Sequence, residues 1–139
     1  MIFIDTWAWV ALALNKDQYH RKATAAHRRF VKQHRRYVTT DFVLSEVIAH
    51  LYSTLPPEKA QAFINTLFES ADAGLHQLVH VSPEQFRRAW QMRQKYADKP
   101  DISFVDFTSM VVMQDLGIVD VFTGDQHFVQ VNLGFRLAP

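Results

Sequence analysis

The chain has 139 residues, of which 48% are hydrophobic and 13% aromatic, and its formal net charge is +1. This length predicts a single domain over residues 1–139 with enough apolar content for a packed core. The absence of cysteine excludes disulfides and thiolate metal sites, and no apolar run reaches the roughly 18 residues of a membrane-spanning helix. No basic segment precedes the first apolar run, so we expect no signal peptide and a cytoplasmic protein.

Apolar runs of strand length alternate with helical patterns along the chain. In chain order the predicted elements are a strand over residues 1–4, a helix over 6–14, an amphipathic helix within 19–37, a strand over 37–40, a helix that carries Glu46, a helix from 55 to about 74, a strand over 75–81, a helix from 82 to about 97, a helix over 104–116, and strands over 118–122 and 133–137. This alternation predicts a three-layer α/β/α fold, in which helices flank a parallel central sheet.

Capping signals support two of the later helices. Ser82 and Gln85 form a capping-box pattern, and Ser103 precedes Asp106 at the same spacing. Gly117 fits the residue that stops the second of these helices. The chain between Ser103 and Gly117 is apolar enough to predict a buried helix.

Four acids stand in settings where a purely structural role is not the only interpretation. Asp5 follows the first strand, Asp125 follows a strand and a glycine turn, and Glu46 is a lone acid in an apolar helix. Asp106 lies in the first turn of its helix, where it could simply stabilise the helix dipole. In open α/β sheets the carboxyl ends of strands form the ligand-binding crevice, so we predict one shared site.

Ordered motifs around these acids resemble the PIN domain, and most closely its VapC-type toxin branch, the ribonuclease half of bacterial toxin–antitoxin pairs. The motifs are Asp5-Thr6, Thr39-Thr40 followed by Glu46, Ser103-Phe-Val-Asp106, Thr123-Gly-Asp125-Gln-His-Phe128, and a further match at Tyr19-His20-x-x-Ala23. The resemblance covers essentially the whole chain. It implies an endoribonuclease that is restrained by a separate antitoxin protein and forms a symmetric homodimer. Trp7 departs from the small residue that many relatives carry there.

Carboxylates suit phosphodiester hydrolysis because Mg²⁺ and Mn²⁺ prefer oxygen ligands and can activate water while stabilising developing charge. We predict that Asp5, Glu46, Asp106 and Asp125 are the catalytic cluster. Asp5 and Asp106 are the foremost metal ligands, and Asp125 and Glu46 complete the cluster directly or through water. Hydroxyls that could orient these carboxylates come from Thr6, Ser103 and Thr123, and Asp101 is a weaker supporting candidate.

A basic segment lies between His20 and Arg36 and contains seven Lys or Arg residues but no acid. Such a segment can hold the phosphates of RNA or an acidic segment of the antitoxin. The residues predicted for this contact are Arg28, Arg29, Arg35 and Arg36. Histidines recur every seven residues in this segment, a spacing of about 10 Å along a helix, which is too long for one zinc ion. We therefore interpret them as surface residues.

Other classes fit the sequence less well. A receiver domain needs paired acids after its first strand, and a haloacid dehalogenase phosphatase needs Asp-x-Asp; neither pattern occurs. The glycine-rich patterns of Rossmann and P-loop nucleotide binders are also absent. The remaining alternative is a PIN-like module that binds RNA or protein without cutting. The three tryptophans, Trp7, Trp9 and Trp90, are interpreted as core or dimer contacts.

Overall fold

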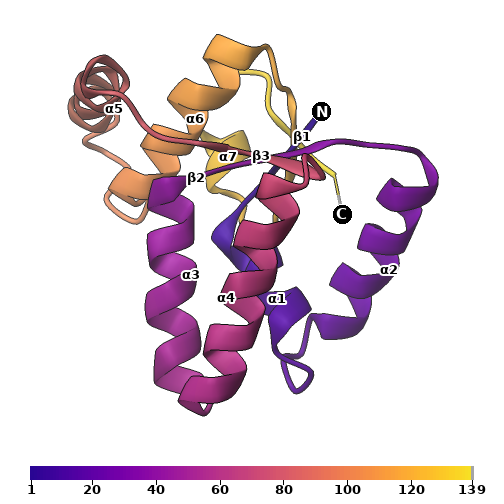
Figure 1. Ribbon diagram of the computed structural model, residues 1–139. Helices are drawn as coiled ribbons and strands as arrows, with labels where there is room; N and C mark the ends of the chain where they lie inside the picture. Colours follow the sequence, from indigo (N-terminus) through magenta and orange to yellow (C-terminus); the bar gives the residue numbers. More distant parts are fainter. Residues whose placement is uncertain (139) are drawn as a thin grey trace.

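The computed structural model describes residues 1–138, in which five strands and seven helices alternate (Figure 1). The strands are β1 (Ile2–Ile4), β2 (Tyr37–Thr40), β3 (His76–Val79), β4 (Asp120–Phe122) and β5 (Arg136–Leu137). The helices are α1 (Thr6–Ala13), α2 (His20–Lys32), α3 (Asp41–Thr54), α4 (Pro57–Asp72), α5 (Pro83–Lys95), α6 (Phe104–Leu116) and α7 (His127–Gln130).

The five strands form one sheet in the order β3-β2-β1-β4-β5, and every neighbouring pair is parallel. The predicted fold class is therefore confirmed. β1 lies at the centre, and its register pairs Ile4 with Phe122 of β4. Because the strands are parallel, the residues that follow β1 and β4 leave the sheet at the same edge.

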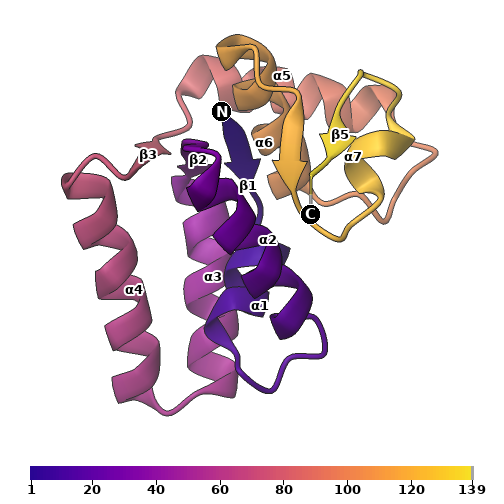
Figure 2. The same ribbon diagram turned by 90° about the vertical axis from the view of Figure 1, so that its right-hand side faces the viewer.

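The helices form two groups around this small sheet. Both views place α1, α2, α3 and α4 together below the sheet, whereas α5, α6 and α7 gather at its upper part (Figures 1 and 2). Phenylalanines fill the core between them, and Phe3, Phe107, Phe122 and Phe128 are fully buried. No helix within residues 1–138 is both long and apolar enough to cross a lipid bilayer.

Helix α6 follows the local signals in its sequence. Its N-cap Ser103 accepts a hydrogen bond from the backbone N–H of Asp106, and Gly117 ends the helix with φ of 67°. The stretch from Asp106 to Met113 is buried, as the sequence predicted. At α5 the Ser82–Gln85 capping box is also present in full.

The ends of several elements differ from the sequence-based prediction. β3 pairs only over the four residues of β2, so Leu75 lies outside the strand and is 70% exposed. The last strand is shortened to Arg136–Leu137, which pair with Asp120 and Val121 of β4. The four-residue helix α7 was not predicted, since one helical turn has no measurable periodicity. It is fixed by burial of Phe128.

Candidate metal centre

Two of the predicted acids lie on the first helix turn after β1 and on the helix after β2. Asp5 is the N-cap residue of α1 and is only 4% exposed. Its Oδ2 accepts a hydrogen bond of 2.9 Å from Oγ1 of Thr123. Glu46 extends from α3 and accepts a hydrogen bond of 2.6 Å from Oγ1 of Thr6. Hydroxyls from neighbouring elements therefore hold both carboxylates in one orientation.

The other two acids meet at a histidine. Nδ1 of His127 lies 2.9 Å from Oδ2 of Asp106 and 3.0 Å from Oδ2 of Asp125. The second oxygen of Asp125 accepts the backbone N–H of His127, and its own N–H donates to Oγ1 of Thr123. Thr123 thus connects the two halves of the cluster, because the same hydroxyl donates to Asp5.

Electrostatic coupling links all four acids. Burial and then the Asp106 carboxylate raise the pKa of Asp5 from 3.8 to about 7. Burial raises the pKa of Glu46, and Asp106 adds to this shift while the Thr6 hydroxyl opposes it. Burial also raises the pKa of Asp106, with a further contribution from Asp125, against the hydrogen bond from His127. Asp5, Glu46 and Asp106 are therefore harder to ionise because they are buried and because a neighbouring carboxylate is near.

This set of donors fits a divalent cation. Carboxylate oxygens are preferred by Mg²⁺ and Mn²⁺, and one oxygen each from Asp106 and Asp125 lies with a ring nitrogen of His127 within 4.8 Å. A bound cation would also relieve the repulsion that raises the pKa values of the buried acids. The acids could hold the ion, while Thr6 and Thr123 orient them.

Within residues 1–138, Asp101 and the four arginines make no hydrogen bond or ion pair with the acids of this cluster. Asp101 is exposed in the turn before α6. Arg35 donates to Asp120 at the beginning of β4, with N–O of 2.8 Å, which places it at the amino edge of the sheet. Arg28 and Arg29 are exposed on α2. The basic residues therefore do not line the acid cluster, and their contact with RNA or antitoxin stays a prediction.

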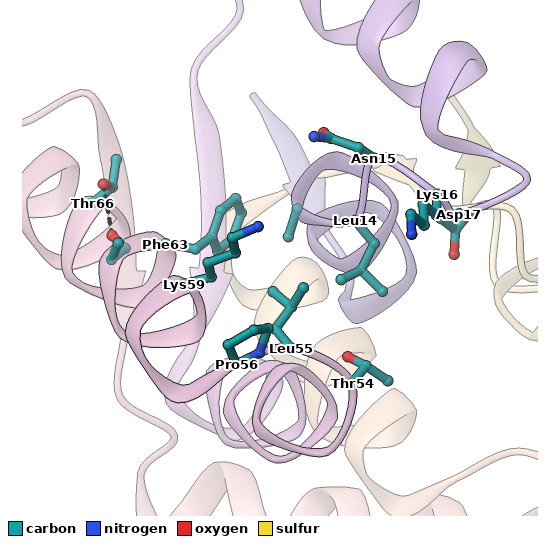
Figure 3. Close-up of a pocket in the computed structure, with 12 residues that line it drawn as sticks. Leu14, Asn15, Lys16, Asp17, Thr54, Leu55, Pro56, Lys59, Phe63 and Thr66 are labelled. Carbon is teal, nitrogen blue, oxygen red and sulfur yellow. Dashed lines mark hydrogen bonds between the residues drawn. The ribbon is translucent and has the colours of Figure 1, made fainter.

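Two hollows lie against α4, away from the acids. One, of about 710 Å³, lies between the end of α1 and the α3–α4 turn, where Leu14, Leu55 and Phe63 face one another (Figure 3). The other, of about 840 Å³, lies between α2 and α4 and includes Arg35 and Arg36. Phe63 lines both hollows, so together they follow much of α4.

The histidines correct part of the sequence interpretation, whereas the tryptophans agree with it. His20 and His27 are half-buried rather than solvated, because their Nδ1 atoms bond Ala11 O and the Tyr37 hydroxyl, each at 2.8 Å. Trp9 belongs to the core, whereas Trp90 on α5 is 53% exposed and is not a core residue.

Sequence reasoning gave no role to His127, although it lies in the motif that contains Asp125. The available signal was its spacing, because a residue two positions after a turn aspartate can fold back over that aspartate. The hydrogen bond from the His127 backbone to Asp125 makes this turn and brings the imidazole to Asp106.

Three solved structures illustrate the fold that this chain shares with known proteins. VapC20 from Mycobacterium tuberculosis, a toxin that cleaves the sarcin–ricin loop, is 27% identical with a TM-score of 0.79, over 98% of this chain and 97% of that one. DNA-bound VapBC from Salmonella typhimurium is 18% identical with a TM-score of 0.69, over 99% and 97%. FitAcB from Neisseria gonorrhoeae is 14% identical with a TM-score of 0.66, over 100% and 97%. No curated protein matches the chain significantly.

A family model gives the assignment independently of these structures. The model for the PIN domain matches residues 2–133, which include all four acids and nearly the whole sheet. The sequence motifs, the parallel sheet and the acid cluster at its carboxyl edge agree with this match. The chain belongs to the PIN domain family.

Proposed function

We propose that this protein is a metal-dependent endoribonuclease and the toxin of a toxin–antitoxin pair. The observation that carries the proposal is the position of Asp106, whose charge raises the pKa of both Asp5 and Glu46 and whose carboxylate meets that of Asp125 across His127. Such a concentration of acids has no stabilising function by itself, since burial and neighbouring carboxylates make Asp5, Glu46 and Asp106 harder to ionise. It is the arrangement expected of a cation site.

In this proposal the acids bind the metal ion, and the neighbouring hydroxyls orient the acids. Asp5 and Asp106 would hold Mg²⁺ or Mn²⁺, with Asp125 and Glu46 completing the set directly or through water. A bound ion would polarise the phosphodiester and lower the pKa of a water molecule. Thr6 and Thr123 keep the Glu46 and Asp5 carboxylates oriented through their hydroxyls. Ser103 fixes Asp106 by capping α6.

Two partners belong to this proposal. A separate antitoxin protein would restrain the nuclease, and the solved neighbours VapBC and FitAcB support this partner. We place its contact along α4, where Phe63 lines both hollows and where Arg35 and Arg36 could meet an acidic segment. The second partner is another copy of the chain, because Phe86 and Trp90 leave an exposed aromatic patch on α5.

RNA cleavage by the purified chain, freed of any partner, tests the proposal. Because VapC20 cleaves the sarcin–ricin loop, an oligonucleotide with that loop and total ribosomal RNA are the first substrates to try. We expect endonucleolytic products with Mg²⁺ or Mn²⁺ and none with EDTA. Asp5→Asn and Asp106→Asn should each abolish cleavage while the circular dichroism spectrum stays unchanged.

The matched control is Asp72→Asn, which removes an exposed carboxylate at the end of α4. This variant should cut RNA like the wild type. If the chain binds RNA but never cuts it with either ion, the non-catalytic alternative replaces the nuclease. If both site variants cut at the wild-type rate, the assigned acids are not the active site.

A further inference from the structure

The contacts of His127 differ from those of an ordinary hydrogen-bonded histidine. The same atom, Nδ1, lies 2.9 Å from an oxygen of Asp106 and 3.0 Å from an oxygen of Asp125. Nδ1 carries at most one proton, and one proton makes one good hydrogen bond. The two carboxylates therefore compete for a single proton on Nδ1, and one of them lies close to the nitrogen without a full hydrogen bond.

These distances are short enough for hydrogen bonds, and they also match the spacing of adjacent ligands around one ion. Bonds of about 2.1 Å to an octahedral cation place adjacent ligand atoms about 3.0 Å apart. Both nitrogen–oxygen separations have this value, and all three atoms lie within 4.8 Å of one another. A divalent cation bound by these three atoms would take the place of the Nδ1 proton and neutralise both carboxylates.

The surrounding chain fixes the imidazole in this position. The His127 backbone N–H binds Oδ1 of Asp125, so the other oxygen of that carboxylate faces the ring. Phe128, the next residue, is fully buried and anchors α7 against the core. The side chain of His127 keeps 23% of its surface exposed, which leaves an entry path for an ion.

We propose that His127 is a nitrogen ligand of the metal, bound through Nδ1, and that it shifts the ion preference of the site from Mg²⁺ toward later transition metals such as Co²⁺. The inference rests on the proposed metal site and adds a ligand that the four acids do not supply. Its chemical basis is ligand type, because carboxylate and water suit Mg²⁺ whereas imidazole favours later transition metals.

Electron spin echo measurements on the Mn²⁺-loaded protein test this directly, without any nuclease assay. A nitrogen bound to Mn²⁺ modulates the echo, and labelling histidine with ¹⁵N changes the modulation frequency. We expect this signal in the wild type and its loss in His127→Asn. Asparagine is the informative replacement, since its amide can still donate a hydrogen bond to a carboxylate but its nitrogen does not bind metal.

Calorimetric titration gives the second readout. His127→Asn should weaken Co²⁺ binding by about tenfold or more, because even groups that only support metal ligands change affinity by that factor when replaced. Mg²⁺ binding should change far less. His50→Asn, at an exposed position on α3, is the control and should keep the echo signal and both affinities.

These measurements distinguish a failure of the His127 proposal from a failure of the proposed metal site itself. If Mn²⁺ binds but its echo shows no nitrogen, or if His127→Asn lowers Mg²⁺ and Co²⁺ affinity equally, His127 is not a ligand and the carboxylate site stands without it. If the wild type binds none of the three ions, the inference fails together with the proposed metal-dependent function.

Discussion

The indole ring of Trp7 lies directly against the backbone of Gly124, so closely that a β-carbon on Gly124 would be 2.4 Å from Cε2 of the ring. Gly124 precedes Asp125, and Trp7 follows the Asp5-Thr6 pair, so the contact joins the two ends of the acid cluster. On its other side the ring meets Tyr19, with ring centroids 5.2 Å apart. Glycine is needed here for its small size, since a side chain would occupy the position of the ring.

Gly124→Ala should therefore displace the acidic turn and destabilise the protein by about 1–3 kcal/mol, the usual cost of overpacking. Trp7→Ala removes the obstacle. The double variant should recover part of the loss caused by Gly124→Ala, so that the two effects are not additive. Urea unfolding of the wild type, the two single variants and the double variant measures this. If the two effects simply add, the indole ring of Trp7 is not the group that the new methyl group displaces.

The Trp7–Gly124 contact also shows what the sequence could and could not predict. Strand periodicity, the cap at Ser103 and the stop at Gly117 are local signals, and they located β1, α6 and the edge where the acids lie. A ring that rests on a glycine more than a hundred residues away has no local signal. Its place depends on the parallel pairing of β1 with β4.

The same distinction applies inside the candidate site. Asp5, Glu46, Asp106 and Asp125 were predictable as a set, because their order and flanking hydroxyls resemble the PIN domain and because parallel strands end at one edge of a sheet. The imidazole of His127 was not, because α7 is a single turn fixed by the burial of Phe128 rather than by its own pattern. Pairing of Arg35 with Asp120 likewise depends on the order of the strands.

Asp5 should make the stability of the metal-free protein depend on pH. Its pKa is raised to about 7 in the folded state, by burial and by Asp106, from an ordinary value of 3.8. Between these two values the folded state binds more protons than the unfolded state, so the free energy of unfolding falls as pH rises. About three pKa units at about 1.4 kcal/mol each give a loss of up to about 4 kcal/mol.

Asp5→Asn removes that loss. In EDTA, its stability relative to the wild type should therefore increase from about pH 4 to about pH 7, as measured by urea unfolding. Burial lowers the pKa of His27 and His76, which gives the opposite slope, but this contribution is common to both proteins and cancels in the difference. A difference that is constant with pH would mean that Asp5 ionises normally.

Arg28 and Arg29 are both exposed on helix α2 and should contribute most to RNA binding. Each phosphate contact with single-stranded RNA adds about 0.7 to the slope of log affinity against log salt, so replacing both with Gln should reduce it by about 1.4. Arg35→Gln should change the slope less, because Asp120 already binds this guanidinium. Filter binding to RNA over a range of salt measures the slopes; an unchanged slope would leave these arginines as solvated surface.

The aromatic patch on α5 should form the homodimer contact. Phe86 and Trp90 are 45% and 53% exposed, so Trp90→Glu adds a charge without opening the core. We expect light scattering to give twice the chain mass for the wild type and a single chain mass for the variant, with unchanged circular dichroism. A monomeric wild type at tens of micromolar would exclude this assembly.

Metal binding should stabilise the fold through Asp106. An ion that binds only the folded state adds about 2.7 kcal/mol at 100 times its dissociation constant, which raises the melting temperature by roughly 10 °C for a chain of this size. Asp106→Asn removes one of the repelling charges. Its backbone N–H can still bind the Ser103 cap, so α6 keeps its N-terminus.

Asp106→Asn should therefore change stability in opposite directions in the metal-free and the metal-bound protein. With EDTA it should be as stable as the wild type or more stable, because burial and Asp125 already oppose the charge at this position. With millimolar Mn²⁺ it should lose most of the metal-dependent rise in melting temperature, whereas the exposed Asp72→Asn should keep all of it. If the wild type melts at the same temperature with and without Mn²⁺, or if Asp106→Asn keeps the full rise, the four acids do not share an ion and serve only as caps and turn residues.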